Sequence, residues 1–231
     1  MPLDKNEIKE LARKLGADMV GVGSAEAMDE APVNHRPTDF LPNAKSIIAI
    51  AVRINYSAVD GLPLTRPEYV NDTNTARNKR NFIICELARK LEEEGFAAIP
   101  FGGGPFDTRA LAGSLSLKHA AVVAGLGEFG LNNLFLSPKY GPRVLLAAIV
   151  TDAELEPDPP FNGKLCDLCE DCLKMCPADS LRNPQGYDRT KGWTIDKLSC
   201  YNYINEVLRP VYGDASCGMC IKACHVGKDK K

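Results

Sequence analysis

The spacing of hydrophobic and polar residues predicts two amphipathic helices in the first hundred positions. In residues 8–15 the apolar side chains recur at helical spacing, after a capping-box pair formed by Asp4 and Glu7, and Gly16 is a typical helix end. Residues 75–94 repeat the helical pattern over a longer stretch and also stop at a glycine. The expected core face of this second helix consists of Ile84, Leu87, Ala88 and Leu91.

Four further segments have the pattern of strands, and one more has that of a helix. Residues 46–52 and 144–150 are continuous apolar runs, which are typical of strands buried on both faces. Shorter apolar runs at 19–22 and 97–101 predict two more strands, and residues 115–124 predict a third helix. The pattern therefore indicates a sheet with packed helices, an α+β organisation.

A proline-rich stretch at 157–160 leads from this region into a segment dense in cysteine. Four of the nine cysteines follow the spacing C-x₂-C-x₂-C-x₃-C-P, which is the bacterial run for 4Fe-4S clusters. The two-residue gaps bring three thiolates around one cluster, whereas the fourth cysteine of such a run ligates the other cluster. We therefore assign one 4Fe-4S cluster to Cys166, Cys169, Cys172 and Cys224, and a second to Cys176, Cys200, Cys217 and Cys220.

Other uses of these cysteines fit the pattern less well. Zinc also binds Cys-x₂-Cys pairs, but the third cysteine at the same spacing and the Cys176-Pro177 step favour iron and sulfur. Disulfides are disfavoured because nothing marks the chain as secreted. The second half of the set is irregular, since Cys224 precedes His225 rather than a proline. The swap of one ligand between the two cysteine runs is therefore an inference, and the alternative is one regular cluster and one irregular cluster.

Composition and charge limit the kinds of partner that we expect for this chain. The chain has 231 residues, 45% of them hydrophobic, and a net charge of −2, so there is no overall basic character for nucleic acid. Arg77, Lys79 and Arg80 form a local basic cluster, which we interpret as a solvated helix face. No apolar run reaches membrane-spanning length, and the charged N-terminus lacks an apolar leader segment. The expectation is a cytoplasmic protein without a membrane partner.

The segment Gly125-Leu-Gly127-Glu-Phe-Gly130 matches the G-x-G-x-x-G fingerprint of dinucleotide-binding folds. That fingerprint needs a strand before it and a helix after it, and Pro138 and Pro142 leave little room for the helix. A glycine-rich turn at which the backbone approaches a bulky cofactor is the favoured interpretation.

Several segments resemble the epoxyqueuosine reductase family and the related reductive dehalogenases. The resemblance is carried by AGLGEFGLNNLFLSPKYGPRVLLAAIVTD, by CDLCEDCLKMCPADSL, by the stretch after Cys200 and by the last cysteines. It covers about residues 110–225 well and the first 110 residues loosely, through GADMVGVG and LPNAKSIIAIAV. It implies a nitroreductase-like α/β domain at 1–155 that binds a cobalamin, followed by a ferredoxin-like domain with two 4Fe-4S clusters at 156–231.

The implied activity is that of a corrinoid-dependent reductase. The clusters would pass electrons from an external donor of the ferredoxin or flavodoxin type to cobalt, which in its Co(I) state cleaves a C–O or C–halogen bond of a small molecule. The candidate cofactor-binding residues are Gly125, Gly127, Gly130, Asn132 and Arg143.

The catalytic residues depart from the family pattern. The position of the family's catalytic aspartate holds Leu111, so Asp107 is the substitute candidate, and the family's lysine matches Lys118. Tyr140 is a third candidate, as the acid that dehalogenases use. For Tyr140 and Arg143 we favour a structural turn as the alternative, because SPKYGPR is rich in turn-forming residues.

The resemblance also bears on the substrate. Epoxyqueuosine reductases carry a further helical-repeat domain that helps to hold tRNA, whereas seven residues follow Cys224 here, so tRNA is a poor candidate. The second hypothesis is an electron-transfer protein, or a partner that reduces a corrinoid, without substrate chemistry of its own.

Overall fold

The two continuous apolar runs form the centre of the main sheet. The computed structural model describes residues 4–103, 106–107, 111–213 and 216–228, with the side chains of 106 and 107 left out. Its helices and strands, in chain order, are α1 (Lys5–Lys14), β1 (Met19–Ser24), η1 (Glu26–Met28), η2 (Pro37–Asp39), β2 (Ser46–Arg53), α2 (Tyr56–Asp60), α3 (Arg66–Glu93), β3 (Ala98–Phe101), β4 (Phe106–Asp107), β5 (Ala112–Gly113), α4 (Leu117–Val123), β6 (Glu128–Phe129), β7 (Phe135–Leu136), β8 (Val144–Thr151), α5 (Asp171–Lys174), α6 (Lys197–Asn202), η3 (Tyr203–Leu208), α7 (Arg209–Tyr212) and α8 (Met219–Ala223).

Residue contacts divide the chain into two units, each built from separate stretches. Unit 1 contains residues 1–52, 76–127 and 145–162, and unit 2 contains residues 53–75, 128–144 and 163–231. Each unit thus combines stretches that are separate in sequence, whereas the two predicted domains are continuous and meet near residue 155. The two domains stay a prediction.

The main sheet has the strand order β1-β2-β8-β3. β1 pairs antiparallel with β2, with Gly21 opposite Ala49, and β3 pairs antiparallel with β8, with Ile99 opposite Val150. All four predicted strands are therefore present, and the two continuous apolar runs take the two central places. The two β-hairpins β4-β5 and β6-β7 are short and separate from this sheet.

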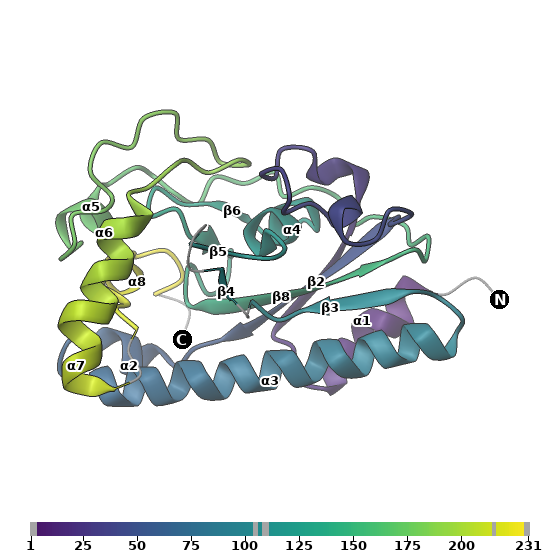
Figure 1. Cartoon of the computed structure of the whole chain (residues 1–231), viewed down its shortest axis with the longest axis horizontal. Helices are drawn as coiled ribbons and strands as arrows, with labels where there is room; N and C mark the ends of the chain where they lie inside the picture. Colours follow the sequence, from purple (N-terminus) through teal and green to yellow (C-terminus); the bar gives the residue numbers. More distant parts are fainter. Residues whose placement is uncertain (1–3, 104–105, 108–110, 214–215, 229–231) are drawn as a thin grey trace. The chain divides into compact units, whose positions relative to one another are not determined.

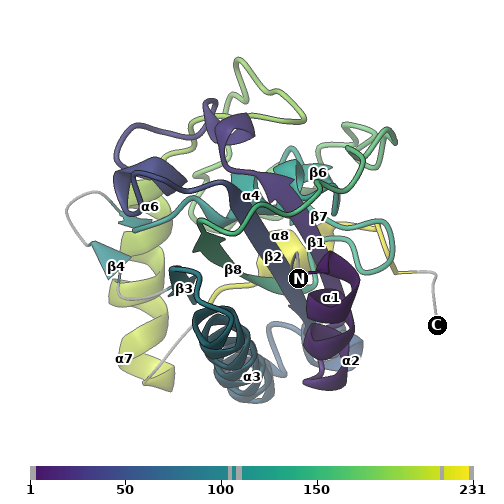
Figure 2. The ribbon, with the colours of Figure 1, turned by 90° about the vertical axis from the view of Figure 1, so that its right-hand side faces the viewer.

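Both faces of the sheet are covered, which explains the unbroken apolar runs. One face packs against α1 and α3, through side chains that include Ile50 and Ile149. The other face packs against α4 and η1 and includes Ile47 and Val150. Figures 1 and 2 show α1 and α3 on one side of the sheet and α4 on the other. The α+β character expected from the pattern is confirmed.

The predicted helices are present, with two local differences. Asp4 caps α1 by accepting from the Asn6 amide at 2.9 Å, where the sequence had suggested a capping box with Glu7. The long helix α3 begins at Arg66, about nine residues earlier than expected, and its predicted core face is buried. Arg80 is only 7% exposed and donates to the Leu146 carbonyl at 2.7 Å, so its interpretation as part of a solvated face was wrong.

The G-x-G-x-x-G segment has the reverse of a dinucleotide-binding arrangement. The helix α4 ends just before Gly125, and the short strand β6 begins at Glu128. A dinucleotide site needs the strand first and the helix second, so this alternative is excluded for the segment. Gly125 has φ +72, and a Cβ atom there would overlap the Pro159 carbonyl, so the chain's own packing requires this glycine.

Unit 2 has two small apolar clusters in place of a sheet core. One gathers Ile54, Val59, Leu62 and Tyr69 with side chains of the segment 219–221. The other gathers Leu131, Cys172 and Leu181, with further cysteines and Trp193 packed against them. The cysteines therefore form part of the second of these clusters, in which Cys172 is buried.

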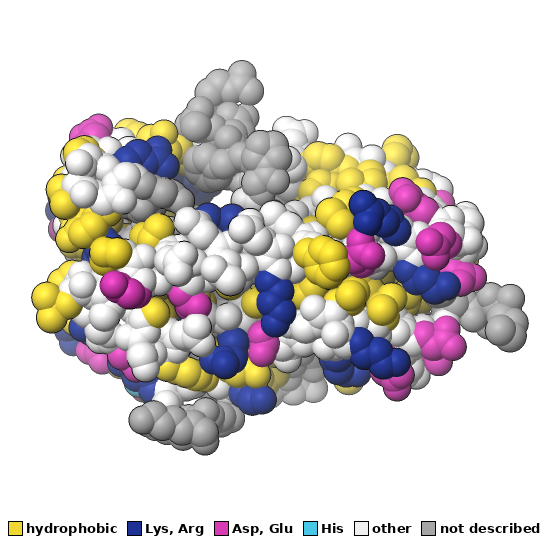
Figure 3. All heavy atoms as spheres, turned by 90° about the horizontal axis from the view of Figure 1, so that it is seen from below, with side chains coloured by type: hydrophobic (Ala, Val, Ile, Leu, Met, Phe, Trp, Pro, Cys, Tyr) yellow, Lys and Arg dark blue, Asp and Glu magenta, His cyan; other side chains and the backbone are white. Residues whose placement is uncertain are grey.

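Two surface observations concern possible partners. Among the helices that the structure describes, none is long and apolar enough to cross a membrane. Figure 3 shows Lys and Arg side chains intermixed with Asp and Glu on the face that it presents, and the ion pairs Glu86–Arg89 and Lys90–Glu94 on α3 illustrate this mixture.

Gly21 gives a test of how closely α4 packs on the sheet. A Cβ atom at this position of β1 would overlap the Ala124 carbonyl and lie 2.9 Å from the Leu126 side chain. We expect Gly21→Ala to lower the free energy of unfolding by about 1–3 kcal/mol through overpacking. Gly113→Ala is the matched control, because its nearest neighbour lies at 4.0 Å. Equal unfolding midpoints for the two variants would contradict the packing described here.

Candidate cysteine-rich redox site

Four of the predicted ligands surround one cavity in unit 2. Cys166, Cys169, Cys172 and Cys224 line a small space that is partly open to solvent, together with Gly130, Leu131, Asn132, Leu136, Asp167, Glu170, His225 and Val226. Three of the cysteines come from a single loop and the short helix α5, whereas Cys224 arrives from the end of α8. The structure therefore brings together the first, second and third cysteines of the run with the last cysteine of the chain.

These four thiols are electrostatically coupled. Burial, and after it repulsion from the thiolates of Cys224, Cys166 and Cys169, raises the pKa of Cys172 to about 12. Burial also raises the pKa of Cys224, although the Arg143 guanidinium opposes this shift. Without a positive centre, four ionised thiols in this space would repel one another.

The other four predicted ligands form a second coupled group. Burial raises the pKa of Cys220 well above its ordinary range, and the thiolates of Cys217, Cys200, Cys176 and Cys172 raise it further. Burial raises the pKa of Cys200 as well, with contributions from Cys217 and Cys176. Cys172 belongs to the first group, and it lies in the apolar cluster against which Cys220 packs and contributes to the raised pKa of that thiol. The two groups are therefore neighbours.

An apolar wall accompanies the two groups. Cys166, Cys176 and Cys220 pack against the cluster of Leu131, Cys172 and Leu181, next to Trp193. The indole of Trp193 donates to the Leu131 carbonyl at 2.9 Å, which fixes the ring in this position. Excluding water from sulfur ligands is one way in which a protein sets a cluster's potential. The ninth cysteine, Cys85, is an exposed residue of α3 and belongs to neither group.

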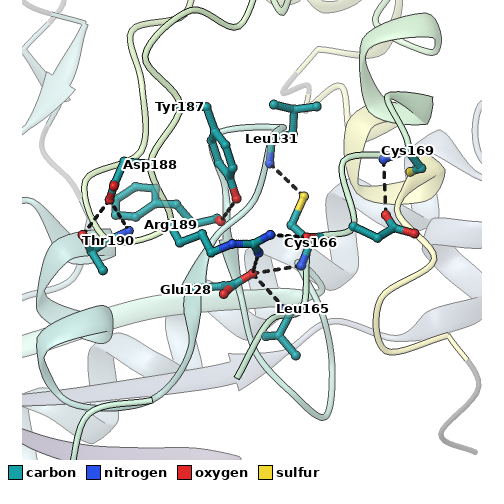
Figure 4. Close-up of polar contacts among 11 residues, drawn as sticks. Glu128, Leu131, Leu165, Cys166, Cys169, Tyr187, Asp188, Arg189 and Thr190 are labelled. Atoms are coloured by element: carbon teal, nitrogen blue, oxygen red, sulfur yellow. Dashed lines mark hydrogen bonds and ion pairs between the residues drawn. The ribbon is translucent and has the colours of Figure 1, made fainter. Parts of the chain in front are cut away.

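A buried carboxylate holds the start of the cysteine loop (Figure 4). Glu128 is 4% exposed, and its Oε1 accepts from the amides of Leu165 and Cys166, each at 2.9 Å. Arg189 donates to the same oxygen at 2.6 Å and to the Cys166 carbonyl at 2.8 Å. The Leu131 amide points at the Cys166 sulfur at 3.4 Å. These contacts hold the peptide groups on both sides of Cys166 and so fix its orientation.

Two buried arginines hold the later cysteines through their carbonyls. Arg143 is fully buried and donates to the carbonyls of Cys224 at 3.0 Å and Val226 at 3.1 Å. Arg66 is 2% exposed and donates to the carbonyls of Ser216 at 2.7 Å and Cys217 at 2.6 Å. Each group of thiols thus has a guanidinium bonded to the main chain of one of its members.

The donor set fits a metal–sulfur centre. Each group offers four thiols, and mutual repulsion opposes their ionisation until a cationic core is present. Sulfur ligands in such numbers suit iron–sulfur clusters and zinc, and the spacing of the run distinguishes the two. Asp167, Cys169 and His225 also have ligand atoms within 4.8 Å of one another, but Cys169 already belongs to the first group.

The predicted catalytic residues of unit 1 are placed only in part. Asp107 lies on β4 opposite Ala112, and its side chain is outside the described residues. Lys118 is the second residue of α4 and half-buried. Leu111, at the position of the family's aspartate, has φ +48, a left-handed conformation that leucine rarely adopts. The roles assigned to Asp107 and Lys118 stay predictions.

In unit 2, Tyr140 and Arg143 make structural contacts. The Tyr140 amide donates to the Ser137 hydroxyl at 3.0 Å inside a turn closed by Ser137 and Gly141. These contacts agree with the structural turn that we favoured, and roles toward a substrate or corrinoid stay predictions. Among the other cofactor candidates, Asn132 accepts from the Leu134 amide at 3.0 Å, and both Asn132 and Gly130 line the first cysteine cavity.

Sequence reasoning missed the residues that hold the cysteine loops. Arg189 and Arg66 have no motif around them, and the glycine motif around Glu128 does not point to the cysteines; the partners of the three residues lie 23–151 positions away. The available signal for Glu128 was its place inside an otherwise apolar segment, since a charged residue there needs a buried partner.

The comparisons with known proteins point in one direction. No family model matches the chain. A tetrachloroethene reductive dehalogenase of Desulfitobacterium hafniense is 28% identical over 202 residues, covering 80% of this chain and 33% of its own. The epoxyqueuosine reductase of Bacillus subtilis is 27% identical over 268 residues, covering 98% of this chain and 64% of its own. The chain thus spans between one third and two thirds of the length of these relatives.

Solved structures of both kinds share the fold. A catabolic reductive dehalogenase in complex with 3-bromo-4-hydroxybenzoic acid aligns with a TM-score of 0.73 at 21% identity, over 97% of this chain and 32% of that one. Epoxyqueuosine reductase in complex with a tRNA stem loop aligns with a TM-score of 0.67 at 22% identity, over 98% of this chain and 66% of that one. A third similar structure is that of a reductive dehalogenase, from which a mechanism for B12-dependent dehalogenation was suggested.

The homologues of this chain are therefore epoxyqueuosine reductases and reductive dehalogenases, as the resemblance predicted. Its relatives are named as reductases, in agreement with the predicted oxidoreductase class. Because one of them is bound to a tRNA stem loop, the expectation that nucleic acid is not a partner stays a prediction.

The carboxylate of Glu128 is testable by amide exchange. Glu128→Ala removes the acceptor of two main-chain amides and leaves the Arg189 guanidinium without its ion pair. We expect the amides of Leu165 and Cys166 to exchange at least about tenfold faster, since losing a buried partner costs about 1–3 kcal/mol. Hydrogen–deuterium exchange with mass spectrometry measures this. Exchange no faster than in Glu206→Ala, an exposed control in the same unit, would refute the assigned role.

Proposed function

We propose that this protein is an iron–sulfur oxidoreductase, a corrinoid-dependent reductase of a small molecule with two 4Fe-4S clusters. The observation that carries the proposal is the assembly of eight cysteines into two coupled groups of four, from segments up to 58 positions apart. In the proposed domain scheme, residues 1–155 form a nitroreductase-like domain and residues 156–231 a ferredoxin-like module. The reductase names of the relatives support this class.

The residues have distinct roles in this proposal. Cys166, Cys169, Cys172 and Cys224 hold one cluster, and Cys176, Cys200, Cys217 and Cys220 hold the other. When bound, the clusters supply one-electron transfer from an external donor, and the corrinoid supplies the reductive bond cleavage. The protein's own contribution is to hold the thiols in place, through Glu128, Arg143 and Arg66, and to keep water from the sulfurs.

For the proton that a reductive cleavage consumes, Asp107, Lys118 and Tyr140 are the proposed donors. The proposed corrinoid contacts are Gly125, Gly127, Gly130, Asn132 and Arg143. A small-molecule substrate is proposed over tRNA because the net charge is −2.

An electron-transfer protein without substrate chemistry is the second candidate. It is favoured by Leu111, which puts an apolar side chain at the position of the family's catalytic aspartate. Such a protein would take up the clusters and exchange electrons, and it would neither retain a corrinoid nor turn over a substrate.

Metal content separates the two candidates. We expect the anaerobically reconstituted protein to contain about eight irons per chain, as two four-iron clusters require. Incubation with cobalamin, followed by gel filtration, is expected to leave cobalt bound with an altered corrin absorption spectrum. Elemental analysis and visible spectroscopy provide both readouts.

The outcomes have different meanings. Eight irons without retained cobalt would contradict the corrinoid reductase and leave the electron-transfer protein. Zinc in place of iron would overturn both candidates.

Pairs of cysteine substitutions test the assignment of ligands. If Cys176 and Cys200 share a cluster, Cys176→Ala and the double variant Cys176→Ala/Cys200→Ala should lose the same share of iron, roughly four of eight atoms. Cys176→Ala/Cys169→Ala should instead lose both clusters, because its two changes fall in different groups. Iron analysis after reconstitution measures each loss.

Cys85→Ala is the matched control for these variants, since Cys85 is exposed and outside both groups. It should retain all of the iron. The reverse pattern, with Cys176→Ala/Cys169→Ala losing no more than Cys176→Ala alone, would mean that the ligands are not exchanged between the runs.

A further inference from the structure

We propose that Arg143 and Arg66 are a pair of charge-tuning residues, each of which raises the reduction potential of one of the two proposed clusters. The inference rests on the proposed function, because it needs the clusters to be present. It goes further in assigning each guanidinium to one group of thiols and in predicting how the two potentials respond separately.

The placement of Arg143 carries the first half of the argument. The side chain is fully buried, and both of its terminal nitrogens donate to main-chain carbonyls, one of which belongs to the ligand Cys224. The positive charge of Arg143 therefore lies beside the main chain of a ligand in the first group, and its side chain is shielded from water.

Arg66 has the same relation to the second group. It is the first residue of α3, is 2% exposed, and donates through one nitrogen to the carbonyls of Ser216 and Cys217. Cys217 is one of the ligands proposed for the second cluster, so this charge also lies beside the main chain of a ligand. The two arginines come from different parts of the chain, so each can be changed without touching the other.

Electrostatics gives the direction of the effect. Four thiolates leave a 4Fe-4S cluster net negative, and reduction adds one more negative charge. A nearby cation therefore stabilises the reduced form more than the oxidised form, and low solvent access strengthens the interaction. Removing either guanidinium should make its cluster harder to reduce.

The two arginines differ in how far their charge is neutralised. Arg143 has Asp60 at 3.8 Å, a carboxylate whose side chain is half exposed, whereas Arg66 has no carboxylate in ion-pair distance among the described residues. The ring of Tyr212 lies 5.9 Å from the Arg66 guanidinium and adds no charge. Asp60 should therefore reduce the shift that Arg143 gives to its cluster.

The test is an anaerobic redox titration of the reconstituted full chain, followed by electron paramagnetic resonance. We expect Arg143→Gln to lower the midpoint potential of one cluster and Arg66→Gln to lower that of the other cluster. In each variant the second potential should stay unchanged. The expected change is at least a tenfold fall in the equilibrium constant of reduction, which is about 59 mV for a one-electron couple. Glutamine keeps a hydrogen-bond donor, so a shift reports the loss of charge.

Two further variants separate charge from structure. Arg143→Lys keeps the charge and should stay close to the wild-type potential, whereas a purely structural role would move it as far as glutamine does. Asp60→Asn removes the partner carboxylate and should raise the potential of the same cluster that Arg143→Gln lowers. Iron analysis of every variant confirms that both clusters are present.

The outcomes distinguish this inference from the function on which it rests. If the wild-type chain binds no iron, the proposed function fails and the tuning pair fails with it. If all variants hold eight irons and the potentials do not move, or if both potentials move together in each variant, the tuning pair is refuted and the proposed function stands.

Discussion

The rest of unit 2 depends on one constraint, the repulsion among buried thiols that must lie together. Burial, together with the repulsion of three neighbouring thiolates, raises the pKa of Cys172 to about 12. A chain that gathers such groups needs fixed contacts to hold the loops, because the thiols themselves do not attract one another. Glu128, Arg143 and Arg66 provide those contacts at the peptide groups beside the ligands, leaving the sulfur atoms available for a metal centre.

These three side chains are charged and buried, which is costly unless each is well bonded. Glu128 receives three donors, and the terminal nitrogens of Arg143 have two carbonyl acceptors and a nearby carboxylate. The Nε of Arg143 has no hydrogen-bond partner among the described residues, so its bonding is incomplete. The retention of a guanidinium in such a place is the physical reason to look for a role beyond packing, and electrostatic control of a neighbouring negative centre is the role that its position offers.

The sequence was informative wherever one local pattern determines the structure. The apolar runs of β2 and β8 and the buried stripe of α3 are periodic, and hydrophobic periodicity is the main signal of secondary structure. The two-residue gaps of the cysteine run are also a local pattern, and Cys166, Cys169 and Cys172 line one cavity, while the assignment of the eight cysteines to two clusters stays a prediction. The contacts of Glu128 with Leu165 and of Arg66 with Cys217 join positions 37 and 151 residues apart, and no local pattern encodes such pairs. Arg80 was misjudged for the same reason, since this residue of α3 is buried against β8 and donates to the Leu146 carbonyl, 66 positions away.

Electron delivery and proton donation are separable demands, and the chain treats them differently. The thiols and the groups that hold them form a connected set, so a change at Arg189 or Glu128 acts directly on the position of Cys166. Leu111 belongs to no such set, and its φ of +48 is a conformation that an aspartate adopts more readily than a leucine. An apolar residue can stand at that position without disturbing the cysteines. Under the proposed function, the electron path can be kept while the acid moves to another residue or is lost, and this is why retained cobalt, rather than iron alone, distinguishes the reductase from the electron carrier.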